Sequence, residues 1–153
     1  MQRKEFEKKG ETRDASKLKV GIVVSRFNTD VTEPMLEGAR AALKRWGVKE
    51  KSIFVSHVYG SFELPIAAAR LVRKHRADAL VAIGCIIKGE TRHDEYLAQA
   101  TFHGLMRVSL DSDVPVGLGV LTTNTLAQAR ARSRGKTNHG EKAAEAALEA
   151  ALL

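Results

Sequence analysis

The segment from Lys88 to His93 combines two features that could do chemistry. Its first four residues precede a helical stretch, so their backbone N–H groups and the helix dipole could bind an anion. His93 lies at the end of the same segment, and an imidazole both donates and accepts protons near neutral pH. The structural alternative is an ordinary strand-to-helix turn, in which Gly89 allows the turn and Thr91 caps the helix. The segment matches neither a Walker loop nor a dinucleotide-binding fingerprint.

A second polar turn, from Gly60 to Glu63, precedes another helical stretch. Ser61 could cap that helix, and Glu63 could complement its positive N-terminus. The same carboxylate and free N–H groups could instead bind a polar heterocycle or the hydroxyls of a polyol. Phe27 is similarly either a core residue or a stacking surface for a ring. The residue types alone leave both alternatives open.

Three further features bear on the chemistry. Arg132 could hold a phosphate through two parallel hydrogen bonds, although a solvated helix face is the simpler interpretation. Cys85 ends an apolar run with no base placed beside it, so we expect a small buried residue and not a nucleophile. The neighbours His93, Asp94 and Glu95 point in different directions and lack a second spaced histidine. We therefore expect no metal site.

Short apolar runs alternate with helical stretches from Leu18 onward. We predict strands at Lys19 to Ser25, Ser52 to Val58, Ala79 to Ile87 and Pro115 to Thr122. Helices are predicted at Thr32 to Trp46, Glu63 to His75, Glu95 to Leu110, Thr125 to Ser133 and Glu141 to Leu152. The first strand is almost continuously apolar, which is typical of a strand covered on both faces.

This alternation predicts an α/β fold, a flavodoxin-like three-layer α/β/α sandwich with a four-stranded parallel sheet. We expect the strand order 2-1-3-4, in which a crevice opens at the carboxyl ends of strands 1 and 3. Residues 25–28 and 88–93 would then face each other across that crevice. The expected organisation is a polar N-terminal arm at 1–17 and a single domain at 18–153.

Composition narrows the class of protein. The 153 residues carry a net charge of +7, from 25 basic and 18 acidic residues, which favours anionic ligands. Basic and acidic residues are interleaved and aromatic residues make up 5%, so no nucleic-acid binding is expected. One cysteine, no long apolar run and a charged N-terminus predict a cytoplasmic protein without a disulfide, a membrane-spanning helix or a secretory signal.

Four motifs occur together and in register. They are residues 25–28 (SRFN), 60–65 (GSFELP), 84–93 (GCIIKGETRH) and 119–125 (GVLTTNT). In this order they resemble the lumazine synthase family, which makes 6,7-dimethyl-8-ribityllumazine in the penultimate step of riboflavin biosynthesis. The resemblance runs from Lys19 to Ala147 and covers the whole predicted sheet.

The resemblance implies a condensation of 5-amino-6-(D-ribitylamino)uracil with 3,4-dihydroxy-2-butanone 4-phosphate, without a metal or an organic cofactor. It assigns proton transfer to His93. It assigns the uracil pocket to Phe27, Ser61, Phe62, Glu63 and the main chain of Cys85, Ile86 and Ile87. It assigns phosphate binding to the backbone of Glu90 and Thr91 together with Arg132.

Two positions depart from the family pattern. Asp94 stands where the family usually has an aromatic residue, directly after the histidine. Leu118 stands where the family has an aromatic residue that enters the uracil pocket of a neighbouring subunit. A longer segment before the last helix leaves His139 or Lys142 as candidates for a second cation beside the phosphate.

The resemblance also implies a homo-oligomer, either a pentamer or a larger assembly of pentamers. Sites would lie between adjacent subunits, and the arm at 1–17, with Phe6, would add a strand to a neighbour's sheet. Riboflavin synthase is a further candidate partner. Two alternatives stay open, an archaeal-type riboflavin synthase and a shell-forming or ligand-binding homologue with little or no activity.

Overall fold

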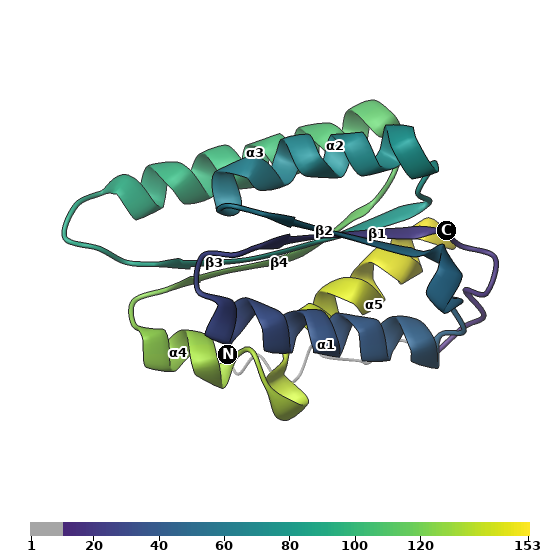
Figure 1. Cartoon of the computed structure of the whole chain (residues 1–153), viewed down its shortest axis with the longest axis horizontal. Coiled ribbons are helices and arrows are strands. Elements are labelled where there is room, and N and C mark those ends of the chain that lie inside the picture. The colour runs from purple at the N-terminus through teal and green to yellow at the C-terminus, as the bar shows by residue number, and fades with distance from the viewer. Residues whose placement is uncertain (1–10) are drawn as a thin grey trace.

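The computed structural model describes residues 11–153, and these residues contain one four-stranded sheet (Figure 1). The strands are β1 (Val20–Ser25), β2 (Ile53–Val58), β3 (Ala79–Ile87) and β4 (Val116–Thr123). All neighbouring pairs are parallel, and the order is β2-β1-β3-β4. The predicted strand order is therefore confirmed.

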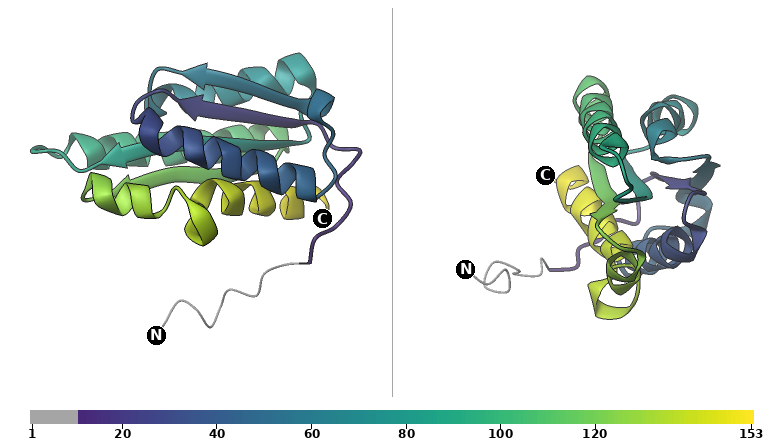
Figure 2. Two further views of the ribbon diagram at one scale, coloured as in Figure 1. Left: turned by 60° about the horizontal axis from the view of Figure 1, so that its bottom comes forward. Right: turned by 90° about the vertical axis from the view of Figure 1, so that its left-hand side faces the viewer.

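Helices cover both faces of the sheet, as the views in Figure 2 show. The helices are α1 (Thr29–Arg45), α2 (Leu64–His75), α3 (His93–Ser112), α4 (Leu126–Ala131) and α5 (His139–Ala151). Short 3₁₀ turns lie at η2 (Glu50–Ser52), η3 (Ser61–Glu63) and η4 (Gly135–Thr137). Helices α2 and α3 cover one face, and α1, α4 and α5 cover the other. The predicted three-layer sandwich is confirmed.

The two central strands are the most buried part of the chain. Every residue of β1 is buried, and β3 is buried except at its last residue, Ile87. Strands covered on both faces are almost continuously apolar, which explains the sequences of both. The edge strands β2 and β4 are only partly buried.

Alternate residues of β1 belong to two separate hydrophobic cores. Ile22 packs with Met35 and Leu43 of α1 and with Leu148 of α5. The second core joins residues from β1, α2, β3, α3 and β4, including Val23, Leu64, Leu80, Leu105 and Val120. Each fully buried side chain of this size contributes about 1.5–3 kcal/mol relative to an exposed one. Packing on both faces thus holds the central strands in place.

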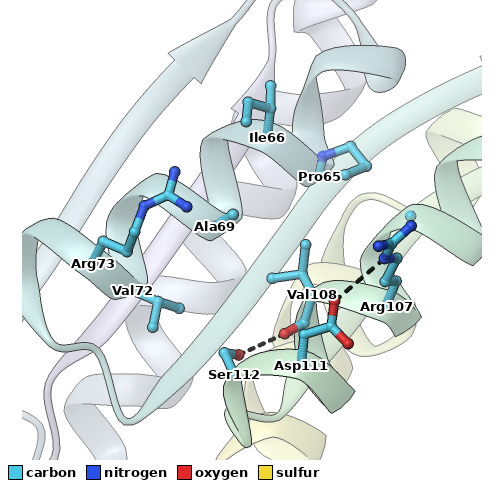
Figure 3. A pocket seen from close by; sticks show the side chains of 10 residues that line it. Pro65, Ile66, Ala69, Val72, Arg73, Arg107, Val108, Asp111 and Ser112 are labelled. Carbon is cyan, nitrogen blue, oxygen red and sulfur yellow. Dashed lines mark hydrogen bonds and ion pairs between the residues drawn. The ribbon is translucent and has the colours of Figure 1, made fainter.

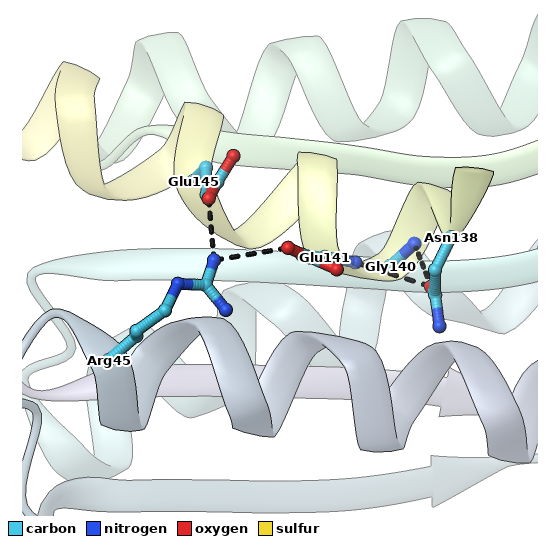
Figure 4. Close-up of polar contacts among 5 residues, drawn as sticks. All are labelled: Arg45, Asn138, Gly140, Glu141 and Glu145. Carbon is cyan, nitrogen blue, oxygen red and sulfur yellow. Dashed lines mark hydrogen bonds and ion pairs between the residues drawn. The ribbon is translucent and has the colours of Figure 1, made fainter. Parts of the chain in front are cut away.

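Helix α5 lies very close to its neighbours because glycine stands at the contacts. A side chain at Gly140 would collide with the Met35 carbonyl, and one at Gly117 would collide with the backbone of α5. The Asn138 side chain caps this helix by accepting a hydrogen bond of 2.9 Å from the Gly140 N–H (Figure 4). Its amide also donates a hydrogen bond of 3.0 Å to the Pro34 carbonyl. The same residue therefore starts α5 and ties it to α1.

An arginine joins the same two helices further along. The Arg45 guanidinium lies 3.1 Å from the Glu141 carboxylate and 2.6 Å from the Glu145 carboxylate (Figure 4). The two carboxylates are four residues apart and so share one face of α5. Contacts between α1 and α5 thus run along most of the length of α5.

Three helix starts differ from those predicted by two residues or more, and one of them is α5, which begins at His139 and not at Glu141. Helix α1 begins at Thr29 and not at Thr32, because Asn28 takes a left-handed conformation and turns the chain directly into the helix. Helix α3 begins at His93 and not at Glu95. Helix α1 ends at Arg45, one residue before the predicted Trp46, and Gly47, with a φ of 86°, turns the chain away from it. His93 thus lies in a helical first turn and not in a loop.

Part of the predicted arm packs on the domain. Ala15 is buried in the core beside α1, and its N–H donates a hydrogen bond of 2.8 Å to the Trp46 carbonyl. Residues 1–10, with Phe6 and its predicted pairing to a neighbouring subunit, lie outside the described residues. Within residues 11–153, each helix is too short or too polar to cross a membrane.

Candidate functional site

The carboxyl ends of the four parallel strands lie on the same side of the molecule, which we call the carboxyl edge of the sheet, but the strands end at two different levels. Ser25 and Val58, the last residues of β1 and β2, are register partners. The pairing of β1 with β3 stops at Ile83, whereas β3 continues to Ile87 beside Thr123 of β4. At about 3.3 Å per residue, β3 and β4 extend roughly 10 Å further than β1. The loop after β3 therefore projects beyond the rest of the edge, at the far left of Figure 1.

Phe27 lies in the loop after β1, and the end of β2 holds that loop in place. The Arg26 N–H donates a hydrogen bond of 2.7 Å to the Val58 carbonyl, and the Phe27 N–H donates one of 3.1 Å to the Tyr59 carbonyl. The side chain of Phe27 is 61% exposed, so the core interpretation is wrong. An exposed ring on a fixed backbone can stack on a flat ligand.

Asn28 ties the same loop to β3. Its φ of 62° lies in the left-handed region, which asparagine tolerates better than most residues. Its side-chain amide donates a hydrogen bond of 3.1 Å to the Cys85 carbonyl. The Thr32 hydroxyl donates one of 2.9 Å to the Ser25 carbonyl. The Phe27 loop is thus attached to β2, β3 and α1 at once.

The turn after β2 packs directly on β3. Ser61 is buried, and a Cβ added at Gly84 would lie only 2.7 Å from its hydroxyl oxygen. The Ser61 carbonyl accepts a hydrogen bond of 3.4 Å from the Thr101 hydroxyl of α3. Phe62 is exposed, and Glu63, the N-cap of α2, makes no side-chain capping bond. Ser61 therefore anchors the turn while Phe62 and Glu63 lie nearer the surface.

The end of β3 contributes a buried thiol and a main chain. Burial raises the pKa of the Cys85 thiol to about 11, and the Asp30 carboxylate acts in the same direction. The thiol is therefore protonated at neutral pH, and the prediction of a buried, non-nucleophilic cysteine is confirmed. Ile86 is also buried, and Ile87 is partly buried.

The loop after β3 is open. The Thr91 hydroxyl accepts a hydrogen bond of 3.3 Å from the His93 N–H, so it helps to start α3. The side chains of Glu90, Thr91 and His93 are exposed. Within residues 11–153, neither a hydrogen bond nor an ion pair engages the His93 imidazole. A Cβ at Gly89 would meet nothing within 4 Å, so an anion can approach this helix N-terminus closely.

Arg132 follows the last turn of α4 and is exposed. Its guanidinium donates a hydrogen bond of 3.0 Å to the Gln128 carbonyl. The flanking arginines are both engaged with Asp30, since Arg130 pairs with its carboxylate at 2.9 Å and Arg134 donates to its carbonyl at 2.7 Å. In the described part of the chain, no carboxylate pairs with Arg132. Its charge is thus available to an anionic ligand.

The two candidates for a second cation lie at the start of α5. The His139 N–H donates a hydrogen bond of 2.9 Å to the Arg132 carbonyl, which places His139 next to Arg132. Lys142 is three residues further along the helix and is exposed. Both side chains have interactions within this chain, so neither is distinguished as the better candidate.

Comparison with known proteins decides the family. Residues 17–153 match the family described as 6,7-dimethyl-8-ribityllumazine synthase. This chain belongs to that family. The match includes every strand and helix of the described structure.

Three curated relatives carry the name of this synthase. The chain is 44% identical to the one from Porphyromonas gingivalis over 133 residues, which cover 87% of this chain and 81% of the relative. It is 41% identical to the one from Phocaeicola vulgatus over 137 residues, covering 89% and 82%. It is 48% identical to the one from an Anaeromyxobacter species over 138 residues, covering 90% and 85%.

Within one chain of this synthase family member, the predicted site residues form two groups. In the first group, Asn28 links the Phe27 loop to the Cys85 main chain. Ser61 belongs to the same group because it packs against Gly84 of β3. The second group comprises the side chains at the projecting loop and at the end of α4. The two groups lie at the same carboxyl ends of the strands, and within residues 11–153 no hydrogen bond or ion pair joins their side chains.

Leu118 is a predicted site residue that lies away from the carboxyl ends of the strands. It pairs with Ala82 in the middle of the β3–β4 ladder and is 51% exposed. The register places it about three residues, or roughly 10 Å, before the position opposite Cys85. Its exposed side chain is therefore available to another molecule and not to the Phe27 loop of its own chain.

Two hollows in the structure lie away from the predicted residues, apart from Glu63. One, of about 560 Å³, lies between α2 and α3, where Ile66 and Ala69 face Val108 (Figure 3). The other, of about 340 Å³, lies between β2 and α2 and includes Glu63 in its wall. Neither is lined by Phe27 or His93. The candidate residues Phe27 and His93 thus lie outside both of these hollows.

The sequence analysis missed Tyr59, which stands one residue after β2. Its ring centroid lies 6.4 Å from that of Phe27, with the two planes at 52°. The signal was present, because Tyr59 directly precedes the polar turn that starts at Gly60. We find no set of three His, Cys, Asp or Glu side chains within residues 11–153 that could hold a metal ion.

Proposed function

We propose that this protein condenses 5-amino-6-(D-ribitylamino)uracil with 3,4-dihydroxy-2-butanone 4-phosphate to give 6,7-dimethyl-8-ribityllumazine, phosphate and water. The family match across residues 17–153 is the observation that carries this proposal. The site geometry supports it, because a ring-stacking surface, an imidazole and a guanidinium lie at one end of the sheet, and neither charged group has an ion-pair partner among residues 11–153. These are the groups that a flat heterocycle, a proton transfer and a leaving phosphate require.

The reaction follows from ordinary amine and carbonyl chemistry. The 5-amino group attacks the ketone, and water leaves to give an imine. Loss of a proton from the neighbouring carbon then expels the phosphate and leaves an enol, which becomes a ketone. The ribityl-bearing nitrogen attacks that ketone, a second water leaves, and the ring closes. Each step moves protons between aligned partners, so positioning and acid–base catalysis are the main tasks for the protein.

The residues divide these tasks. Phe27 would stack on the uracil ring, while Glu63 and the Phe62 backbone hold its polar groups and the ribityl chain. His93, at the tip of α3, would carry protons between the reacting amine, the hydroxyl groups and solvent. Arg132 would hold the phosphate together with the backbone of the projecting loop and stabilise its charge as it leaves.

The proposed oligomer is a homopentamer or an assembly of pentamers. Support comes from large apolar side chains on the surface, since Met106 and Leu110 of α3 and Leu118 of β4 are all more than half exposed. Met106 and Leu110 are four residues apart and so share one face of α3, and exposed apolar surface on a helix face is typical of protein–protein contacts. Native mass spectrometry tests the proposal, and a monomer at micromolar concentration would contradict it.

The activity is tested by mixing the purified protein with both substrates and following the absorbance of the lumazine product. A rate well above the uncatalysed background is expected. An absence of product above background would contradict the synthase function and favour an inactive shell-forming homologue. Riboflavin formed from the lumazine alone would instead indicate a riboflavin synthase.

Location and partners complete the proposal. A single buried thiol, Cys85, fits the reducing cytoplasm that the sequence predicts. Riboflavin synthase, which would consume the product, is the candidate protein partner. Analytical ultracentrifugation of the two purified proteins together tests that association, and independent sedimentation would contradict it.

A further inference from the structure

Exposed aromatic side chains gather where β1 and β2 end. The chain has one tryptophan, two tyrosines and five phenylalanines. Phe27, Tyr59 and Phe62 are all more than half exposed, and all three follow the carboxyl ends of these two strands. By contrast, Trp46 is buried, and Phe54 and Phe102 are partly buried against the core. The ends of β1 and β2 thus carry aromatic surface that the core does not use.

The Tyr59 ring is held beside Phe27. The hydrogen bond from the Phe27 N–H to the Tyr59 carbonyl fixes the two backbones side by side. The ring centroids are 6.4 Å apart and the planes are tilted by 52°, which is within the range of favourable aromatic pairs. Tyr59 is 68% exposed even so, so the contact with Phe27 covers only part of its ring.

We propose that Tyr59 is a further substrate-binding residue, which forms with Phe27 an aromatic wall for the uracil ring of the substrate. This inference rests on the proposed function. Two tilted, exposed rings on fixed backbones present apolar surface to a flat heterocycle without any rearrangement. Within residues 11–153, the Tyr59 hydroxyl makes no hydrogen bond. It can therefore donate to or accept from a ribityl hydroxyl, since Tyr59 adjoins the turn that holds Glu63.

Tyr59 would supply the second stacking ring, which the leucine at position 118 does not provide. Leu118, where the resemblance implies an aromatic residue from a neighbouring subunit, offers no ring to a heterocycle. Stacking on an aromatic side chain strengthens the binding of a nucleobase-like ring by about tenfold or more. Tyr59, beside Phe27 in the same chain, would supply that contribution instead.

The test compares Tyr59→Ala and Tyr59→Phe with the wild-type protein. Tyr59→Ala is expected to raise KM for the ribitylaminouracil about tenfold. The kcat and the KM for the butanone phosphate should stay within about twofold, because the wall contacts the uracil in both the ground and the transition states. Tyr59→Phe keeps the ring and should recover most of the loss, leaving only the part due to the hydroxyl.

The matched control is Tyr96→Ala, which removes the other tyrosine of the chain, also exposed, from α3. It should leave KM for the ribitylaminouracil unchanged. Native mass spectrometry of each variant separates binding from assembly. An unchanged KM in Tyr59→Ala, or a KM change that accompanies a loss of assembly, would overturn the aromatic wall while the synthase function stands. An inactive wild-type protein would overturn the proposed function itself.

Discussion

The two halves of the candidate site are built in opposite ways. The Phe27 loop is fixed by hydrogen bonds to β2 and β3 and packs beside a turn that is anchored on Gly84. The projecting loop before His93 and the guanidinium of Arg132 have few contacts with the rest of the described chain. A flat, neutral ring is best bound by a surface that is already in place. Charged and proton-carrying groups must instead stay unpaired until the substrate arrives, because an internal ion pair would compete with the phosphate.

The largest expected effect on catalysis comes from His93, which belongs to the half of the site with few internal contacts. His93→Ala is expected to lower kcat by about 10²–10⁴-fold, the usual range for losing a positioned acid–base group. Steady-state kinetics with both substrates measures it. His103→Ala removes another exposed histidine of α3 and serves as the control. An equal loss in both variants would show that His93 has no special role.

Arg132→Ala should raise KM for the butanone phosphate about tenfold to a hundredfold, since hydrogen bonds to charged groups contribute about 1.5–3 kcal/mol. The KM for the uracil substrate should change little, which keeps the two halves separable. Arg132→Lys should recover only part of the loss, because a lysine cannot form two parallel bonds. Arg107→Ala, which removes an exposed surface pair with Asp111, is the control. A uniform rise in both KM values would contradict the division.

Gly84→Ala tests how tightly the turn with Ser61 packs on β3, in the half of the site that the Phe27 loop forms. The new methyl group would press on the Ser61 hydroxyl, and overpacking of this kind lowers the free energy of unfolding by about 1–3 kcal/mol. Ser61→Ala in the same chain removes the colliding oxygen and should recover part of the loss. Gly89→Ala in the projecting loop should leave the unfolding midpoint almost unchanged, because open space surrounds it. Thermal and urea unfolding measure all three, and equal shifts at Gly84 and Gly89 would contradict the contrast.

The smallest expected effects on stability and on KM come from substitutions at Asn28. Asn28→Gly keeps the left-handed backbone but loses the bond to the Cys85 carbonyl, which should cost about 0.5–1.5 kcal/mol. Asn28→Ala loses the bond and also strains the backbone by about 1–2 kcal/mol. The alanine variant should therefore unfold at a lower temperature than the glycine variant and show the higher KM for the uracil substrate. Identical behaviour of both would mean that the left-handed turn does not position Phe27.

Much of the fold was predictable because the pattern in the sequence is strong. The apolar runs of β1 and β3 predict central strands, and the alternation with helices predicts the order of the sheet. The helix starts were less accurate, because the left-handed backbone of Asn28 starts α1 and a bond between the Thr91 hydroxyl and the His93 N–H helps to start α3. Hydrophobic periodicity indicates neither feature, since both depend on the three-dimensional path of the loop.

The sequence predicted which residues belong to the candidate site, but not how the strands and turns place them. The motifs identify Phe27, Glu63 and His93 through a family resemblance. They do not indicate that β3 extends past β1, or that Ser61 is buried against a glycine of β3. Both facts depend on register and close packing between distant segments. Tyr59 was missed because a tyrosine at a strand end looks ordinary until its ring is seen beside another exposed ring.

The position of α5 has a consequence for how the protein is made. This helix is the last element of the chain, yet Ala144 and Leu148 complete the core that β1 and α1 begin. On the ribosome, the apolar sides of those earlier elements must wait until α5 has emerged. A chain that stops short of Asn138 would lack both the capping amide and the apolar face, and cellular proteases should remove such fragments rapidly.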